Sequence, residues 1–239
     1  MQYRRIVLNI PHSSCFMWNY DKWEDMEKLA ENVKKWTDWH TDKLFAPVGI
    51  LGVQVKTISF PYSRFYVDVE RLKNDEMEKI GQGIIYTEFE GNKRKVRQKR
   101  HLMSVYNAYI NSFHRYMDTD GCLLIDCHSF PSSFVDDNTS VCIGFNEDES
   151  RPSEEILELV WGIFENEGYK VAFNHPFSNS LTPIKPIKYH SLMIEINKKV
   201  YMNENTLELL PTSYKIMNAI QKVYRSLLPE KVHGKYPQN

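Results

Sequence analysis

Short apolar segments alternate with longer amphipathic segments along most of this chain. Brief runs rich in β-branched and aromatic residues predict β-strands, and apolar residues that recur every three or four positions predict helices. The predicted strands cover residues 4–10, 53–59, 65–69, 122–125, 141–145, 170–173 and 191–196, and the predicted helices cover about 23–45, 92–117, 154–167 and 211–228. This order is typical of an α/β protein with a largely parallel or mixed sheet.

Turn-forming residues mark the ends of several of these elements. Pro11 ends the first strand, and Gly168 suits the position that follows the third helix. Glycines within residues 81–91 predict a loop or a short hairpin. Because no internal repeat and no long linker divides the 239 residues, we expect a single domain over 1–239 with a polar tail from about 229.

The composition is that of an ordinary soluble globular protein, with 42% hydrophobic and 26% charged residues. A formal net charge of −1 gives no global indication of nucleic-acid or membrane binding. No apolar run approaches the ~20 residues of a membrane span, and no signal-peptide pattern precedes the first strand. The four cysteines form neither a CxxC pair nor a zinc-finger spacing. We therefore expect a cytoplasmic protein that binds neither nucleic acid nor membrane.

Polar, chemistry-bearing residues stand where predicted strands end. His12 follows the first strand, Asp126 and His128 follow the strand at 122–125, and Glu195 lies within the last one. In open α/β sheets, ligands bind in the crevice beyond the carboxyl ends of the strands. The repeated placement, more than any one residue, predicts a metal-hydrolase site at this edge.

Two histidines and a third ligand would suit zinc, which takes three protein ligands of histidine and carboxylate type in catalytic sites. Either His12 or His128 alone would more commonly be a hydrogen-bonded loop residue. Asp38, His40 and Asp42 are all available as the third ligand. On one helix Asp38 and Asp42 would share a face, and their ordinary alternative is solvation beside nearby lysines.

The sequence suggests specific roles for two further carboxylates, those of Asp126 and Glu195. Asp126 precedes His128 by two residues, so both project to the same side of a strand, where the carboxylate could fix the histidine tautomer or simply cap a turn. Glu195 interrupts the apolar run LMIEIN, where an unpaired charge is costly. It is therefore either paired in a structural salt bridge or a general base for metal-activated water.

Arg64 and Arg71 flank a segment that contains Asp68, and an arginine can bind a substrate carboxylate or stabilise an oxyanion. Arg71 could equally pair with Asp68. The basic run at residues 93–101 is better explained as a solvated helix face than as a nucleic-acid site. Ser13, Ser129 and Cys127 lie in no nucleophile motif.

Five segments together resemble the N-formylglutamate amidohydrolase family. They are NIPHSS, TDWHTDKL, YSRFYVDVERL, LIDCHSF and HSLMIEINKKVYM, which follow the order and approximate spacing of the family from residue 9 to residue 202. The resemblance implies a three-layer α/β/α hydrolase fold like that of zinc exopeptidases, with a mixed, largely parallel sheet and one zinc ion. It implies zinc ligation by His12, Asp38 and His128, with Glu195 as general base.

The resemblance also suggests the surroundings of the metal. We expect Asp126, His40 and Asp68 behind the ligands, Arg64 at the reacting amide, and Arg64, Arg71, Ser13 and Thr182 at a small substrate that carries a carboxylate. The chain departs from the family pattern at Glu70, where an asparagine is common, and in the loop at 179–183, where a glycine-rich stretch with arginine and histidine is usual. These departures concern the substrate more than the metal chemistry.

The leading hypothesis is therefore a zinc amidohydrolase that acts on an N-formyl or N-acyl amino acid. A zinc peptidase on small or cell-wall peptides would use the same site. A non-catalytic binding protein that retains the fold is the alternative from another class. The sequence leaves the acyl group, the amino acid and the oligomeric state open.

Overall fold

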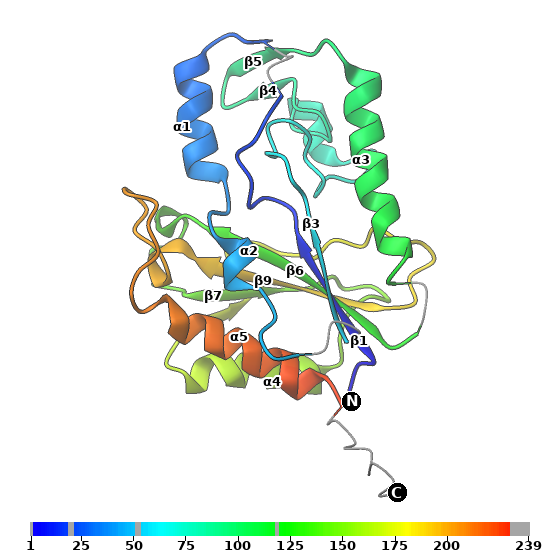
Figure 1. The fold of residues 1–239 in the computed structure, drawn as a ribbon, viewed down its shortest axis with the longest axis vertical. Helices are drawn as coiled ribbons and strands as arrows, with labels where there is room; N and C mark the ends of the chain where they lie inside the picture. The colour runs from blue at the N-terminus through cyan, green and yellow to red at the C-terminus, as the bar shows by residue number, and fades with distance from the viewer. Residues whose placement is uncertain (1, 19–21, 51–53, 118–119, 230–239) are drawn as a thin grey trace, which may run out of the picture.

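A six-stranded mixed sheet forms the centre of the protein (Figure 1). The computed structural model describes residues 2–18, 22–50, 54–117 and 120–229. The strands lie in the order β3-β1-β6-β9-β7-β8; the pairs from β3 to β9 are parallel, β7 is antiparallel to β9, and β8 is parallel to β7. Their bounds are β1 (Arg5–Ile10), β3 (Val55–Ser59), β6 (Cys122–Phe130), β7 (Val141–Gly144), β8 (Val171–Phe173) and β9 (His190–Asn197). The predicted mixed α/β sheet is thus confirmed.

Helices lie on both sides of this sheet. On one side, α4 (Glu154–Asn166) and α5 (Ser213–Leu227) pack with the short α2 (Thr41–Leu44) onto an apolar face. On the other side are α1 (Met26–Trp36), α3 (Lys99–His114) and a small sheet of β2 (Lys22–Trp23), β5 (Asn92–Lys95) and β4 (Glu88–Phe89) (Figure 1). Three 3₁₀ segments complete the described elements: Glu76–Ile80, Ser132–Phe134 and Lys198–Val200.

Strand alternation decides which residues of β6 meet which layer. Leu123, Ile125 and Cys127 enter the core shared with α4 and α5, whereas Leu124 packs with α3 on the opposite face. The same alternation puts Asp126 and His128 on the α3 side; that the two share a side is the prediction from the sequence. Asp126, His128 and Glu195 therefore share one face of the sheet. The other face is largely apolar, with Ser129 and His190 as polar exceptions on β6 and β9.

This core gives a stability prediction. Leu192 of β9 is fully buried between β6 and β7, so Leu192→Ala should lower the free energy of unfolding by about 2–5 kcal/mol because it leaves a cavity. Leu159→Ala is the matched control, since Leu159 of α4 is 38% exposed. Denaturant unfolding measures both variants. Equal losses in the two would contradict the central position of Leu192.

The predicted helix over residues 23–45 is wrong as one continuous helix, because it is broken between α1 and α2. Helix α1 ends at Trp36, because Thr37 takes an extended backbone and its N–H bonds to the Val33 carbonyl. The Asp38 N–H then donates to the His12 carbonyl at 2.9 Å, which ties this turn to the end of β1. Asp38 and Asp42 consequently do not share a helix face.

Two other predicted elements are wrong as well. Residues 65–69 form turns rather than a strand, with the N–H groups of Tyr66 and Val67 both donating to the Ser63 carbonyl. Their apolar side chains are buried in two separate clusters. A run of buried apolar residues has the same sequence pattern as a buried strand, which explains the wrong prediction. The start of the predicted 92–117 helix is strand β5, which pairs with β4 as a hairpin at the end of the 81–91 segment.

The strand predicted at 122–125 is too short, since β6 continues to Phe130 and includes Asp126 and His128; the remaining predicted elements agree with the structure within about two residues at their ends. Gly168 adopts a φ of +84°, as expected after α4. Ser153 occupies the N-cap position of α4, although its side chain makes no capping bond. Residue 53 of the predicted second strand and residues 230–239 of the tail lie outside the described residues. Among the described helices, none has the length and apolarity to span a membrane.

Candidate active site

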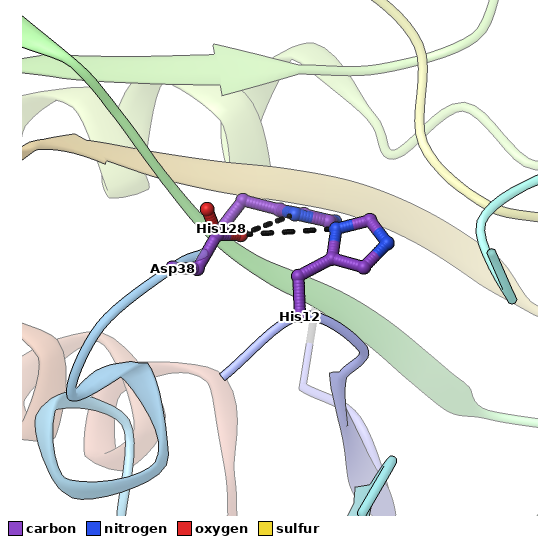
Figure 2. Close-up of side chains that lie close together, drawn as sticks. All are labelled: His12, Asp38 and His128. Carbon is purple, nitrogen blue, oxygen red and sulfur yellow. Dashed lines mark hydrogen bonds and ion pairs between the residues drawn. The ribbon is translucent and has the colours of Figure 1, made fainter. Parts of the chain in front are cut away.

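Three buried side chains from separate segments converge beside the sheet. His12 follows β1, Asp38 lies in the turn between α1 and α2, and His128 belongs to β6. One possible ligand atom from each lies within 4.8 Å of the other two. Asp38 Oδ2 is 3.0 Å from His128 Nδ1 and 3.9 Å from His12 Nδ1, so the carboxylate faces both rings (Figure 2). We call this set the ligand triad.

Each histidine of the ligand triad is also held from behind by a carboxylate. His12 Nε2 lies 2.8 Å from Asp68 Oδ1, and His128 Nε2 lies 3.1 Å from Asp126 Oδ1. Metal-bound histidines characteristically give their second ring N–H to such a group, which fixes the tautomer and the orientation of the ring. Both Nδ1 atoms are thereby left to point toward Asp38.

The donor set fits a zinc ion. Imidazole nitrogens and a carboxylate are ligands that zinc accepts readily. His12 Nδ1 is buried and has no hydrogen-bond partner among the described residues, which is costly unless something binds there. The ligand triad could therefore hold a metal, as the sequence-based assignment of these residues anticipates.

The surroundings give the two histidines opposite protonation preferences. Burial and the nearby Arg64 lower the pKa of His12 to about 4, so this ring is neutral. Burial also disfavours a charged His128, but the Asp126 and Asp38 carboxylates outweigh it and hold the pKa of His128 well above its usual value. A proton shared by His128 Nδ1 and Asp38 Oδ2, which lie 3.0 Å apart, would occupy the position of a metal, and metal binding would release it.

Asp68 is the centre of a second network. It is fully buried, and its Oδ2 accepts hydrogen bonds from Tyr86 and, at 3.3 Å, from Arg64. Arg71 Nε lies 3.7 Å from the same oxygen. Burial alone would raise the pKa of Asp68, but Arg64 and His12 hold it well below the usual value. The pairing of Arg71 with Asp68 is therefore present, and both arginines also line the cavity described below.

Sequence reasoning missed a third network, centred on Asn9 of β1. The amide of Asn9 donates to Glu70 Oε1 at 2.6 Å and to Asp126 Oδ1 at 2.7 Å. Glu70 Oε1 also lies 3.7 Å from His128 Nε2, and burial, with Asp126, raises the pKa of Glu70 to about 7. A polar residue inside the apolar run RRIVLNI was the available signal for Asn9, of the same kind that singles out Glu195.

Glu195 pairs in register with His128 across β6 and β9, so the two side chains lie on the same face. It is buried, and its Oε2 has no hydrogen-bond partner among the described residues. Burial raises the pKa of Glu195 to about 8, with His128 opposing and Asp38 adding to the shift. No lysine or arginine in the described part of the chain forms a salt bridge with Glu195, so the structural ion pair expected as one alternative is absent there.

A cavity of about 430 Å³ opens in front of these groups. It is lined by the ligand triad, Asp126 and Glu195, and by Arg64, Arg71 and Thr182. Lys198, which sequence reasoning also missed, lines it too and donates to the Lys35 carbonyl at 2.6 Å. Volumes of roughly 300–1,000 Å³ are typical of small-molecule sites.

Three predicted site residues do not join this group. His40 Nε2 bonds to the Leu207 carbonyl at 2.8 Å, so this ring faces away from the ligand triad. Asp42 is exposed on α2, which removes it as the third ligand. Ser13 is half-buried and is absent from the cavity wall, because the chain turns away after His12.

A family model for N-formylglutamate amidohydrolase matches residues 4–202. The chain belongs to this family. The match includes every segment that carries the ligand triad, its supporting carboxylates and Glu195. Membership of the family makes the protein an amidohydrolase by class.

Solved structures agree with this family at the level of the fold. An N-formylglutamate amidohydrolase from Ralstonia eutropha JMP134 is 18% identical, with a TM-score of 0.71, and the alignment covers 95% of this chain and 94% of that one. A gene product from Agrobacterium tumefaciens is 12% identical, with a TM-score of 0.59 and coverage of 93% and 91%. A sequence comparison with curated proteins finds no match.

Proposed function

We propose that the protein is a zinc-dependent amidohydrolase that cleaves the amide bond of an N-acyl amino acid. The observation that carries this proposal is the ligand triad, in which each histidine turns Nδ1 toward Asp38 and Nε2 toward a buried carboxylate. Zinc held by His12, Asp38 and His128 would supply Lewis acidity to the amide carbonyl and to water.

The side chains of the cavity supply proton transfer, orientation of the ligands and binding of the substrate. Glu195 takes a proton from the attacking water and delivers it to the leaving nitrogen as the carbon–nitrogen bond breaks. Water thereby adds across the amide and yields a carboxylic acid and an amine. Asp68 and Asp126 hold His12 and His128 in orientation. Arg64 and Arg71 bind the substrate carboxylate, and Arg64 also faces the developing oxyanion.

The charge balance of the cavity supports a divalent ion. The carboxylates of Asp38, Glu70, Asp126 and Glu195 line the cavity, and Asp68 lies behind His12; the cations among them are Arg64, Arg71 and Lys198, with His128 when its ring is protonated. Buried charges without partners are costly, so an excess of carboxylates favours a bound cation. Burial is the main cause of the raised pKa values of Glu70 and Glu195, and neighbouring carboxylates add to both shifts.

Metal analysis and substrate profiling of the purified protein test the proposal. We expect about one zinc per chain, hydrolysis of N-acyl amino acids, and loss of activity on chelation that added zinc reverses. Activity on peptides alone would favour the peptidase. Zinc far below one per chain, with no gain in thermal stability on adding it, would favour a binding protein without catalysis.

A further inference from the structure

One wall of the cavity is aromatic, and the proposed hydrolysis does not use it. Phe130, Phe177 and Trp36 line the cavity. The ring centroids of Phe130 and Phe177 are 6.2 Å apart, and Phe134 lies 5.7 Å from Phe177 and 5.3 Å from Trp36. These four residues form a continuous row, which we call the aromatic wall.

The sheet fixes where this wall lies. Phe130 follows His128 by two residues on the same face of β6, and Met193 precedes Glu195 by two residues on β9. Cys142 Sγ of β7 lies 3.2 Å from the Phe177 carbonyl oxygen. Phe130 and Phe177 of the aromatic wall therefore lie over β6, β9 and β7, and Phe134 and Trp36 continue the wall to the 3₁₀ segment Ser132–Phe134 and to α1.

Gly144 of β7 allows the segment around Phe177 to approach the sheet. A Cβ at this position would stand 2.6 Å from the Asn179 carbonyl oxygen and 2.5 Å from Met193 Cε. Backbone that close to the strand leaves no room for a side chain. The wall is thus built into the fold at β7.

The arginines stand on the opposite side of the ligand triad. Asp68 binds His12, which follows β1, and Arg64 and Arg71 both reach Asp68. Strand β1 lies on one side of β6, whereas β9 and β7 lie on the other. Across the cavity the order is therefore arginines, ligand triad, and then Phe130 and Phe177, whereas the Trp36 end of the aromatic wall packs against Phe89.

In an N-acyl amino acid the amide lies between the acyl group and the α-carboxylate. With the carboxylate at the arginines and the amide at the ligand triad, the acyl group extends toward the aromatic wall. We propose that the aromatic wall is the acyl subsite and that, given the amidohydrolase function proposed above, the substrate carries a large apolar, planar acyl group. A formyl group would place only a hydrogen there, whereas a stacked ring would cover the half-buried ring of Phe177, next to Phe130, which the protein itself already buries.

The test compares substrates that differ only in the acyl group. N-formyl-, N-acetyl- and N-phenylacetyl-L-glutamate are assayed with the zinc-loaded protein, and kcat/KM is expected to be at least about tenfold higher for the phenylacetyl compound. Binding of the formyl and phenylacetyl compounds to the Glu195→Gln variant is measured by calorimetry, which reports on the subsite without turnover. The phenylacetyl compound is expected to bind more tightly.

Variants of the wall separate the subsite from general effects. Phe177→Ala should lower kcat/KM for the phenylacetyl compound about tenfold and leave that for the formyl compound nearly unchanged. Phe177→Leu retains most of the bulk should the alanine variant fail to fold, and it should reduce the same preference. Phe16→Ala is the matched control, because Phe16 is 50% exposed and outside the cavity wall.

The outcomes distinguish this proposal from the one on which it rests. Equal or faster hydrolysis of the formyl compound would overturn the acyl subsite and leave the amidohydrolase standing. Hydrolysis of none of the three would count against the amidohydrolase, and the calorimetry would still decide the subsite. In the calorimetry, equal affinity for the formyl and phenylacetyl compounds, or no binding of either, would overturn the acyl subsite.

Discussion

Replacing Glu195 by glutamine should lower kcat/KM by at least about 100-fold while the protein keeps its zinc, because a positioned general base contributes about 10²–10⁴-fold. Glu195 is buried on the same sheet face as His128, and its Oε2 is unpaired among the described residues. Glutamine fills nearly the same volume but cannot take a proton from water. The measurements are kcat/KM on an N-acyl amino acid and zinc content per chain.

Glu158→Gln is the matched control for this substitution. Glu158 is exposed on α4, which covers the opposite face of the sheet, so its loss should change neither quantity. A Glu195→Gln protein with unchanged turnover would remove Glu195 from the chemistry. A protein that lost zinc together with turnover would instead make Glu195 part of the metal site.

Strand alternation explains why part of this site can be predicted from sequence. In CLLIDCHSF, Leu123, Ile125 and Cys127 occupy successive positions of one face, so Asp126 and His128 share the other. Glu195 stands out for the same reason within HSLMIEIN. Parallel pairing of β6 with β9 then brings the two strand ends to one edge, which is a general property of such sheets.

The segments between strands were harder to predict, because tertiary contacts decide their form. Residues 65–69 are apolar and buried, yet they serve two clusters on different sides and form turns instead of a strand. The break after Trp36 depends on the bond from Asp38 to the His12 carbonyl, a partner remote in sequence. Helical spacing alone predicts one continuous helix across this break. It therefore places His40 and Asp42 on the same helix as residues of α1, whereas His40 precedes α2 and Asp42 lies on it.

The networks around the ligands escape prediction for a related reason. Asn9 and Glu70 are 61 residues apart, and only the fold brings them into contact with each other. Glu70 also follows residues 65–69, which are predicted as a strand but form turns. The direction of the Glu70 side chain could therefore not be predicted from strand alternation. Candidate metal ligands can be recognised in a sequence because few residue types bind metals. Residues that orient the ligands can be of many types and are recognised from their contacts in the structure.

Replacing His128 by alanine is expected to abolish stoichiometric zinc binding and, with it, turnover. The variant retains only His12 and Asp38 of the ligand triad and leaves Asp126 without its imidazole partner. Zinc content and the melting temperature with and without added zinc measure the effect. At a zinc concentration of 100 Kd a single site stabilises the folded state by about 2.7 kcal/mol, so the parent protein should gain stability and the variant should not.

Two further variants separate ligand loss from unfolding. His114→Ala, at an exposed position of α3, is the matched control and should bind zinc as the parent does. Asp126→Asn keeps His128 but removes the carboxylate behind its Nε2, and it should weaken zinc binding by about 10–100-fold. Circular dichroism checks that each variant is folded. A folded His128→Ala protein that still gains stability with zinc would exclude this histidine as a ligand, and the metal would then have to lie elsewhere in the cavity.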